Sequence, residues 1–202
     1  MSLAAKKAGE REEIAVKSPK IEVRMGGFGG QGIVLAGNIL GKAASLFEKK
    51  NVVFTQSYGP EARGGACSAD VVLSEGPIYY PRVTHPHILV LMSQDAKNTY
   101  GSHLPGHFTV IIDEDLVKIE DGDFPGARVF KIPATRLAEK LGKRIVANVV
   151  MLGFIVGVTG IVSPEALRKA LLASIPKGTE ELNIAAFEKG LAYAEKKQKS
   201  PD

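Results

Sequence analysis

The sequence predicts a single α/β domain whose open, mostly parallel sheet is flanked by helices. A strand, a glycine-rich turn and an apolar helix follow one another over residues 21–47, which is the opening of a Rossmann-like βαβ unit. Later in the chain, short continuous apolar runs suit strands that are covered on both faces. The 202 residues, of which 45% are hydrophobic, are enough for one such domain with a substantial core. We expect the domain to span residues 21–195, between a disordered or non-native tail at 1–20 and a charged tail at 196–202.

Two periodicities predict the opening unit. Residues 21–25 alternate apolar and charged side chains and end in a methionine, as a strand can. Residues 33–47 carry apolar side chains at positions 33, 36, 40, 43 and 47, which lie on one face of a helix. This helix is widely apolar, so we expect it to be buried. Residues 26–32 should join the strand to the helix.

The joining segment contains Gly27, Gly29 and Gly32 at the spacing of the G-x-G-x-x-G dinucleotide pattern. Free amides at a helix start would suit a phosphate or a carboxylate. However, no acid closes the next strand-like run, 52–55, where a nicotinamide dinucleotide needs one for its ribose. Ile33 also stands where a Walker A loop has its lysine. NAD binding and ATP hydrolysis are therefore disfavoured, and the glycines either allow close packing or hold part of another anionic ligand.

Gln31 lies in the same segment, where its amide could cap the helix, contact another subunit or bind a ligand. The candidate ligand-binding residues of the segment are Gly27, Gly29, Gly30, Gln31 and Gly32.

A second glycine-rich segment, residues 55–65, is typical of a tight loop. A Gly-Pro pair precedes Glu61, and two glycines follow Arg63. Arg63 could bind a carboxylate or a phosphate in a forked contact, whereas Glu61 could fix the loop through an ion pair with Arg63. We expect this loop to lie beside the glycine segment at the carboxyl ends of the strands. Its candidate contact residues are Tyr58, Gly59, Pro60, Glu61, Arg63, Gly64 and Gly65.

Shorter patterns predict the remaining elements. The apolar runs at 88–92 and 108–112 suit central strands. Ser163-Pro164-Glu165 favours a helix start, since it offers a serine cap, a proline at the first position and an acid in the first turn. The predicted strands after the opening strand are 52–55, 68–73, 88–92, 108–113 and 128–132, and the predicted later helices are 94–100, 133–141, 145–162, 163–175 and 179–193.

Residues 145–162 have only Asn148 and Thr159 as polar side chains. Eighteen residues are at the lower limit for a membrane span. A lone span with three glycines in an otherwise α/β chain is better explained as a buried core or interface helix. Its small residues would let another backbone approach closely, within this chain or from a partner subunit. We predict no membrane contact.

Composition narrows the possible functions further. The net charge of +4 comes largely from the chain ends, and no basic patch interleaved with aromatic residues predicts nucleic-acid binding. The single cysteine, Cys67, excludes an intrachain disulfide and cannot hold an iron–sulfur cluster, which takes about four ligands. We expect Cys67 to be a small buried core residue and predict no metal site, since the four histidines lie in turn-like segments. Residues 1–20 lack the apolar region of a signal peptide, so a cytoplasmic location is expected.

Taken together, these motifs resemble the gamma subunit of 2-oxoacid:ferredoxin oxidoreductases. The resemblance rests first on Gly29-Gly30-Gln31-Gly32 before an apolar helix and on the Thr55–Gly65 loop. It continues in Pro77-Ile78 with Pro81, in Asn148, in Asn183 and in residues 185–190, and it spans roughly residues 21–192.

The resemblance implies one subunit of a complex that oxidatively decarboxylates a 2-oxoacid to an acyl-CoA and reduces ferredoxin. It is closest to the 2-oxoglutarate branch, with pyruvate next. It implies that thiamine diphosphate, Mg²⁺, [4Fe-4S] clusters and CoA act in the complex, and that this chain alone binds none of them and contributes no catalytic residue. The implied partners are alpha, beta and ferredoxin-like delta subunits, with ferredoxin as electron acceptor. Asn148 and Asn183 would join the loop residues as subunit contacts, and the glycine segment and Arg63 could contact CoA or a subunit.

Two alternatives remain at this point. The chain could be a subunit of an indolepyruvate-type oxidoreductase, but residues 58–62 depart from the histidine-glycine-methionine run usual in that branch. It could also be a free-standing dinucleotide-binding oxidoreductase, against which the missing ribose acid argues.

Overall fold

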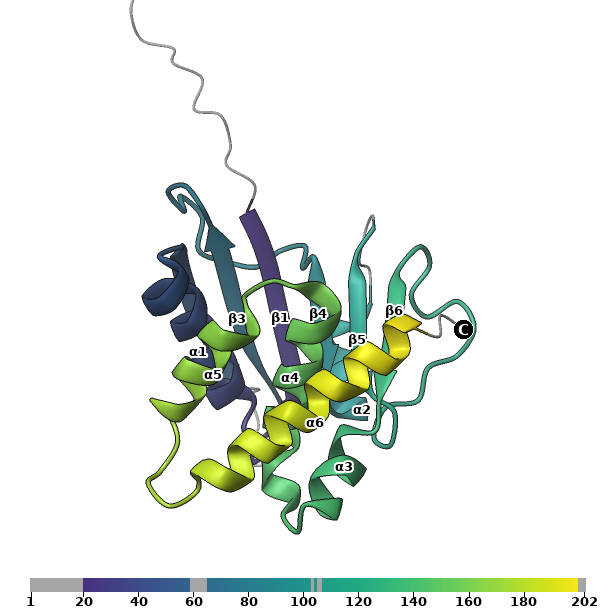
Figure 1. Cartoon of the computed structure of the whole chain (residues 1–202). Coiled ribbons are helices and arrows are strands. Elements are labelled where there is room, and N and C mark those ends of the chain that lie inside the picture. The colour runs from purple at the N-terminus through teal and green to yellow at the C-terminus, as the bar shows by residue number, and fades with distance from the viewer. Residues whose placement is uncertain (1–19, 59–64, 103, 105–106, 200–202) are drawn as a thin grey trace, which may run out of the picture.

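The computed structural model describes residues 20–58, 65–102, 104 and 107–199, and it confirms the predicted α/β class (Figure 1). One sheet has the strand order β2-β3-β1-β4-β5-β6. Its strands are β1 (Lys20–Phe28), β2 (Asn51–Tyr58), β3 (Ala66–Ser74), β4 (Ile88–Leu91), β5 (Thr109–Asp113) and β6 (Arg128–Ile132). The helices are α1 (Ile33–Lys42), a π-helical turn (Ala43–Phe47), α2 (Gln94–Tyr100), α3 (Ala134–Lys140), a 3₁₀ turn (Arg144–Val146), α4 (Ala147–Thr159), α5 (Pro164–Leu172) and α6 (Glu180–Lys199).

The sheet is mostly parallel, and β3 is the exception. β1, β4, β5 and β6 pair in parallel, whereas β3 pairs antiparallel with β1 on one side and β2 on the other. β2 and β3 are joined by only a few residues, and a connection of that length can form a hairpin but not a parallel crossover. β3 therefore lies between β1 and β2. The predicted position of the 55–65 loop beside the glycine segment requires the end of β2 to neighbour that segment directly, and this is wrong, although Gly27, Cys67 and Tyr58 do lie in one register across the three strands.

The glycine segment itself is shorter than predicted, because Gly26 and Gly27 belong to β1 and not to the turn. Gly26 pairs with Ser68 on one side and with Leu91 on the other. A Cβ at Gly26 would lie 2.9 Å from a ring carbon of Tyr100, and one at Gly27 would lie 2.5 Å from Oε1 of Gln31. These two glycines therefore allow close packing against the strand, and the turn consists of residues 29–32.

Helices cover both faces of the sheet, and each face has its own apolar core. Side chains of β1 and β4 such as Met25 and Val90 pack with α1, α4, α5 and α6 in the larger core. The alternate β4 residues Leu89 and Leu91 point to the other face, where a smaller core includes Ala96 of α2. Since neighbouring residues of β4 serve opposite cores, this strand is apolar throughout, as its sequence predicts.

The 145–162 segment forms a core helix, as expected. Ten of the 13 residues of α4 are buried, and the small residues of α4 face α6 of the same chain. A Cβ at Gly153 would lie 2.1 Å from the carbonyl oxygen of Phe187, and one at Gly157 would lie 2.4 Å from Cβ of Ala194. Within the part of the chain described, no helix combines the length and apolar character that a membrane crossing requires.

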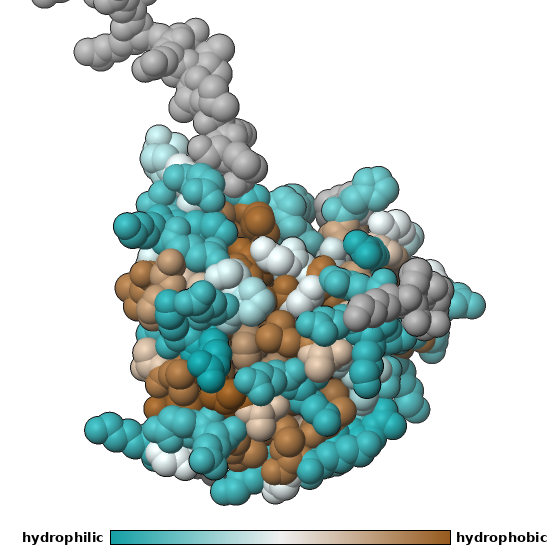
Figure 2. Space-filling view, viewed as in Figure 1, coloured by the Kyte–Doolittle hydropathy of each residue, from teal (hydrophilic) through white to brown (hydrophobic). Residues whose placement is uncertain are grey.

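Two ends of helices differ from the predicted pattern. Phe47 is 40% exposed and not buried, because α1 passes into the π-helical turn, whose wider winding changes the direction of later side chains. At the other end of the chain, α6 continues to Lys199, past the predicted helix end at residue 193, and the side chain of Gln198 donates to the carbonyl of Gly157 at 2.9 Å. Seen from the same side as Figure 1, hydrophobic side chains are interspersed with hydrophilic ones on the face formed by these helices (Figure 2).

Candidate functional site

The candidate site begins at the turn between β1 and α1, which Gln31 holds in place. Oε1 of Gln31 accepts a hydrogen bond from the amide of Phe28 at 2.9 Å, and Nε2 donates to the carbonyl of Met92 at 2.6 Å. Phe28 ends β1 and Met92 follows β4, so one side chain connects the carboxyl ends of two neighbouring parallel strands. The helices that follow these strands, α1 and α2, lie on opposite faces of the sheet. This is a topological switch point, where open α/β sheets form their binding crevices.

Asn148 fixes the other end of the same turn. Its Nδ2 donates to the carbonyl of Gly32 at 3.1 Å, and the Asn148 side chain is buried among the first residues of α4. Gly32 has a φ of +71°, a left-handed conformation that favours glycine, and a Cβ there would lie 2.3 Å from Nδ2 of Asn148. The structure thus brings together two residues that the sequence selected independently, 116 positions apart.

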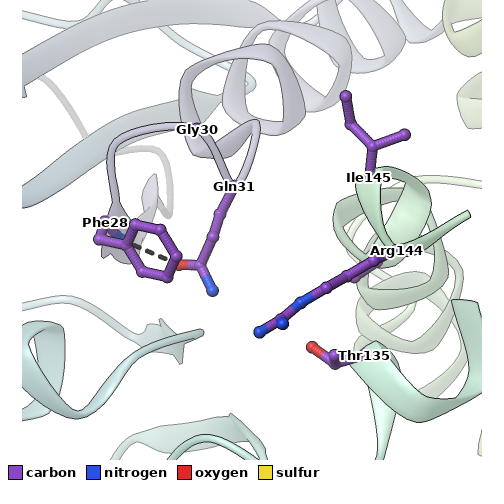
Figure 3. Close-up of a pocket in the computed structure, with 7 residues that line it drawn as sticks. Phe28, Gly30, Gln31, Thr135, Arg144 and Ile145 are labelled. Carbon is purple, nitrogen blue, oxygen red and sulfur yellow. Dashed lines mark hydrogen bonds between the residues drawn. The ribbon is translucent and has the colours of Figure 1, made fainter. Parts of the chain in front are cut away.

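A pocket of about 390 Å³ opens beside this turn, which is within the usual size range of small-molecule sites. One wall comes from the end of β1 and its turn, and the other comes from the segments around α3 and the start of α4 (Figure 3). The lining residues are Phe28, Gly30, Gln31, Thr135, Arg144, Ile145 and Ala147.

Among the described residues that line the pocket, Arg144 is the only charged one. Its guanidinium extends into the space between Gln31 and Thr135 (Figure 3). Arg144 is exposed, and its side chain makes no ion pair or hydrogen bond with any residue in the described ranges. By contrast, Arg136 nearby pairs with Glu114 and Asp115, each at 3.0 Å. A forked cation without an acidic partner, pointing into a cavity, is suited to binding an anion.

Thr135 is held at the wall by a buried acid. Oδ2 of Asp113 accepts from the Thr135 amide at 2.9 Å and from its hydroxyl at 2.6 Å. Asp113 is fully buried, and this burial raises the pKa of its carboxyl even though the hydrogen bonds from Thr135 oppose the shift. Because the Thr135 proton is directed to Asp113, the hydroxyl serves as a fixed wall and not as a free donor.

The lining suits binding better than catalysis. The lining residues in the described part of the chain include no Asp, Glu, His or Cys that could move a proton or attack a substrate. Gln31 has a second N–H beyond the one donated to Met92, and neither Gly29 nor Gly30 donates its amide to a group of the described residues. Of these residues, Gly30 and Gln31 line the pocket together with Arg144.

Other predicted site residues are placed differently. Gly59, Pro60, Glu61, Arg63 and Gly64 lie outside the described residues, so their predicted contacts stay predictions. At the ends of that loop, Tyr58 is 64% exposed and Gly65 is half-buried.

Asn183 and Cys67 both lie inside the chain. Asn183 is buried and donates to the carbonyl of Thr179 at 2.8 Å, which secures the start of α6. Its role as a subunit contact, like that of Asn148, stays a prediction. Cys67 is buried as expected, and burial raises the pKa of its thiol. In the described ranges, no group of three or more Asp, Glu, His and Cys side chains could hold a metal ion.

Sequence reasoning missed Phe28, Thr135 and Arg144. The signal for Arg144 was its position, a cation directly before the longest apolar run of the chain. That position gave no sign of its proximity to the glycine turn.

The chain is an α/β domain with a pocket at the carboxyl ends of its parallel strands. It belongs to the pyruvate ferredoxin/flavodoxin oxidoreductase family, whose sequence model matches residues 22–193. The 2-oxoglutarate synthase subunit KorC of Methanocaldococcus jannaschii is 51% identical over 174 residues, which cover 86% of this chain and 93% of that subunit. The pyruvate synthase subunit PorC of Methanothermobacter thermautotrophicus is 35% identical over 180 residues, covering 87% and 95% of the two chains. Among solved structures, the gamma subunit of a keto/oxoacid ferredoxin oxidoreductase from Geobacter sulfurreducens has a TM-score of 0.79 and 38% identity, over 89% of this chain and 98% of that one.

Proposed function

We propose that this chain is the gamma subunit of a multisubunit 2-oxoacid:ferredoxin oxidoreductase whose substrate is 2-oxoglutarate. The observation that carries the proposal is the 51% identity to a 2-oxoglutarate synthase subunit over nearly its whole length. The identity to a pyruvate synthase subunit is 35%, which makes pyruvate the second choice. The complex would convert the 2-oxoacid and CoA to an acyl-CoA and carbon dioxide and pass the electrons to ferredoxin, in the cytoplasm.

The cofactors of this reaction belong to the other subunits in this proposal. Thiamine diphosphate, with Mg²⁺, stabilises a carbanion, and [4Fe-4S] clusters accept single electrons. The one cysteine of this chain is buried in the sheet and cannot supply the roughly four thiolates of a cluster. We assign clusters and thiamine diphosphate to alpha, beta and ferredoxin-like delta subunits.

The proposed role of this chain is to bind and position. Gly30 and Gln31 line the pocket at the switch point and could contact CoA or a neighbouring subunit. The Tyr58–Gly65 loop, which contains Arg63, is proposed as a subunit contact because the large side chain of Tyr58 at its start is 64% exposed. Neither role requires a catalytic side chain from this chain.

Reconstitution tests the proposal. The chain would be mixed with cofactor-loaded partner subunits, and CoA-dependent viologen reduction would be measured with 2-oxoglutarate and with pyruvate. We expect the full complex to prefer 2-oxoglutarate and the isolated chain to be inactive with either acid. Activity from the single chain, or an undiminished rate in a complex that lacks it, would contradict the subunit assignment.

Arg63→Ala tests the loop in the same assay. We expect this variant to weaken assembly or turnover while the unfolding temperature of the isolated chain stays unchanged, because a loop arginine adds little to the core but offers several directed donors. If instead the chain loses stability and turnover per folded chain stays normal, Arg63 only supports the fold.

A further inference from the structure

The pocket at the switch point has features beyond the Gly30 and Gln31 contacts of the proposed function. It has one forked cation without an acidic partner in the described ranges, donors from a glycine turn, and apolar walls. We infer that this pocket binds the phosphate group of a small organic molecule, with Arg144 as the principal ligand-binding side chain. The inference deepens the ligand role proposed for the glycine turn, and it does not depend on which 2-oxoacid the complex uses.

The charge pattern favours an anion. Acids close to the pocket already have partners: Glu114 and Asp115 pair with Arg136, and Asp113 is buried beneath Thr135. None of these three carboxyl groups pairs with the Arg144 side chain, so its guanidinium is available to a ligand. Its exposure lets it reach the ligand without a prior cost of breaking an ion pair.

The donor geometry favours a phosphate over a lone carboxylate. The guanidinium lies across the space from the Gln31 amide (Figure 3), and the Gly29 and Gly30 amides next to Gln31 are without partners in the described structure. Donors on two sides of a space match a tetrahedral group with several acceptor oxygens, while a planar carboxylate is satisfied by the guanidinium fork alone. Backbone amides in a glycine turn before a helix are a common phosphate-binding arrangement.

The remaining walls favour an organic body on the phosphate. Phe28 is 37% exposed and Ile145 is 71% exposed, and both line the pocket with Ala147. An inorganic ion would leave this apolar surface and most of the 390 Å³ unused. A ligand with a flat or apolar body of mononucleotide size would cover it.

Binding to the full-length chain tests the inference with four probes: ADP, inorganic phosphate, adenosine and succinate. We expect saturable binding of ADP by calorimetry and weaker binding of phosphate. Adenosine and succinate should bind more weakly than ADP by roughly tenfold or more, which corresponds to the loss of one or two charged hydrogen bonds. Adenosine bound as tightly as ADP would show that the phosphate is not recognised. Succinate bound as tightly would make this a carboxylate site, and no saturable ADP binding would also overturn the inference.

Variants then assign the site. Arg144→Gln should weaken ADP binding by roughly tenfold or more, and Arg144→Lys should weaken it less, because it keeps the charge but loses the fork. The matched control is Lys143→Gln, which removes the same charge one residue away, outside the lining residues. Equal ADP affinity in Arg144→Gln and the wild type would refute the assignment. Because binding is measured on the single chain, a failure here is distinct from a failure of the reconstituted complex to use 2-oxoglutarate.

Discussion

Gly153→Ala should destabilise the chain strongly for a single added methyl group. Gly153 lies where α4 crosses α6, and its added Cβ would meet the carbonyl oxygen of Phe187 at 2.1 Å and the amide nitrogen of Leu191 at 3.1 Å. The reverse holds for Gly190 on α6, where an added Cβ would lie 2.0 Å from the carbonyl oxygen of Val150. Both obstacles are main-chain atoms, so no side-chain rotation can make room. The helices must move apart.

The size of the effect follows from these distances. Ordinary contact begins at 3.4 Å, so α6 would have to retreat by about 1.3 Å, the difference between 3.4 and 2.1 Å. Such a shift loosens the packing of Phe154 and Phe187, both fully buried. Overpacking typically costs about 1–3 kcal/mol, and the rigid obstacle favours the upper end. The higher helix propensity of alanine relative to glycine offsets about 1 kcal/mol of this cost. The expected net loss is about 2 kcal/mol, or roughly 4–8 °C in unfolding temperature for a chain of this size.

Urea unfolding followed by circular dichroism measures this loss, and Gly41→Ala is the matched control. Gly41 is also a helical glycine, but its added Cβ would meet only Cγ1 of Val52, at an ordinary 3.5 Å. That variant should be neutral or more stable by up to about 1 kcal/mol. A Gly153→Ala chain as stable as the wild type would show that the two helices are not in the close contact described.

Two further predictions concern the site and the acid side of the stability curve. Gly32→Ala should destabilise the chain by about 1–3 kcal/mol, since an alanine there would have to adopt a φ of +71° and its Cβ would displace the buried Asn148 amide. In a double-mutant cycle with Asn148→Ala, the changes in unfolding free energy should be non-additive. Additive changes would show that the two residues do not interact. Burial raises the pKa of Glu48, but the hydrogen bonds from Lys50 and Ser163 outweigh it and lower the pKa in the folded state. Its stabilising contribution is therefore present above the ordinary value of 4.5 and lost as pH falls through the lower folded value. Glu48→Gln should flatten the loss of stability below about pH 4.5, and an unchanged acid profile would contradict this.

The sequence was sufficient to predict the elements that depend only on neighbouring residues. The apolar run of β4 and the cap at Ser163, which accepts from the Ala166 amide at 3.2 Å, both depend on neighbouring residues, and both appear where predicted. The order of strands was not predictable in the same way, because the insertion of β3 depends on hairpin closure and on pairing with a strand about 45 residues earlier. The reason for glycine at position 27 was not predictable from neighbouring residues either. Gly27 lies in a strand and not in a turn, and glycine is needed there because a Cβ would meet the Gln31 side chain.

The pocket is built from residues that lie far apart in the sequence, and α4 holds several of them in place. The residues directly before and at the start of α4, Arg144 and Ala147, line the pocket, and the next residue, Asn148, holds Gly32. One turn further on, Gly153 brings α4 against α6. A single buried helix thus couples the position of Arg144, the proposed ligand-binding cation, to the glycine turn on one side and to the core on the other. Substitutions in the body of α4 should therefore change stability and site geometry together, whereas Arg144, exposed and without a partner in the described ranges, can be changed with little effect on folding. Variants of Arg144 therefore test the proposed binding role separately from the stability of the fold.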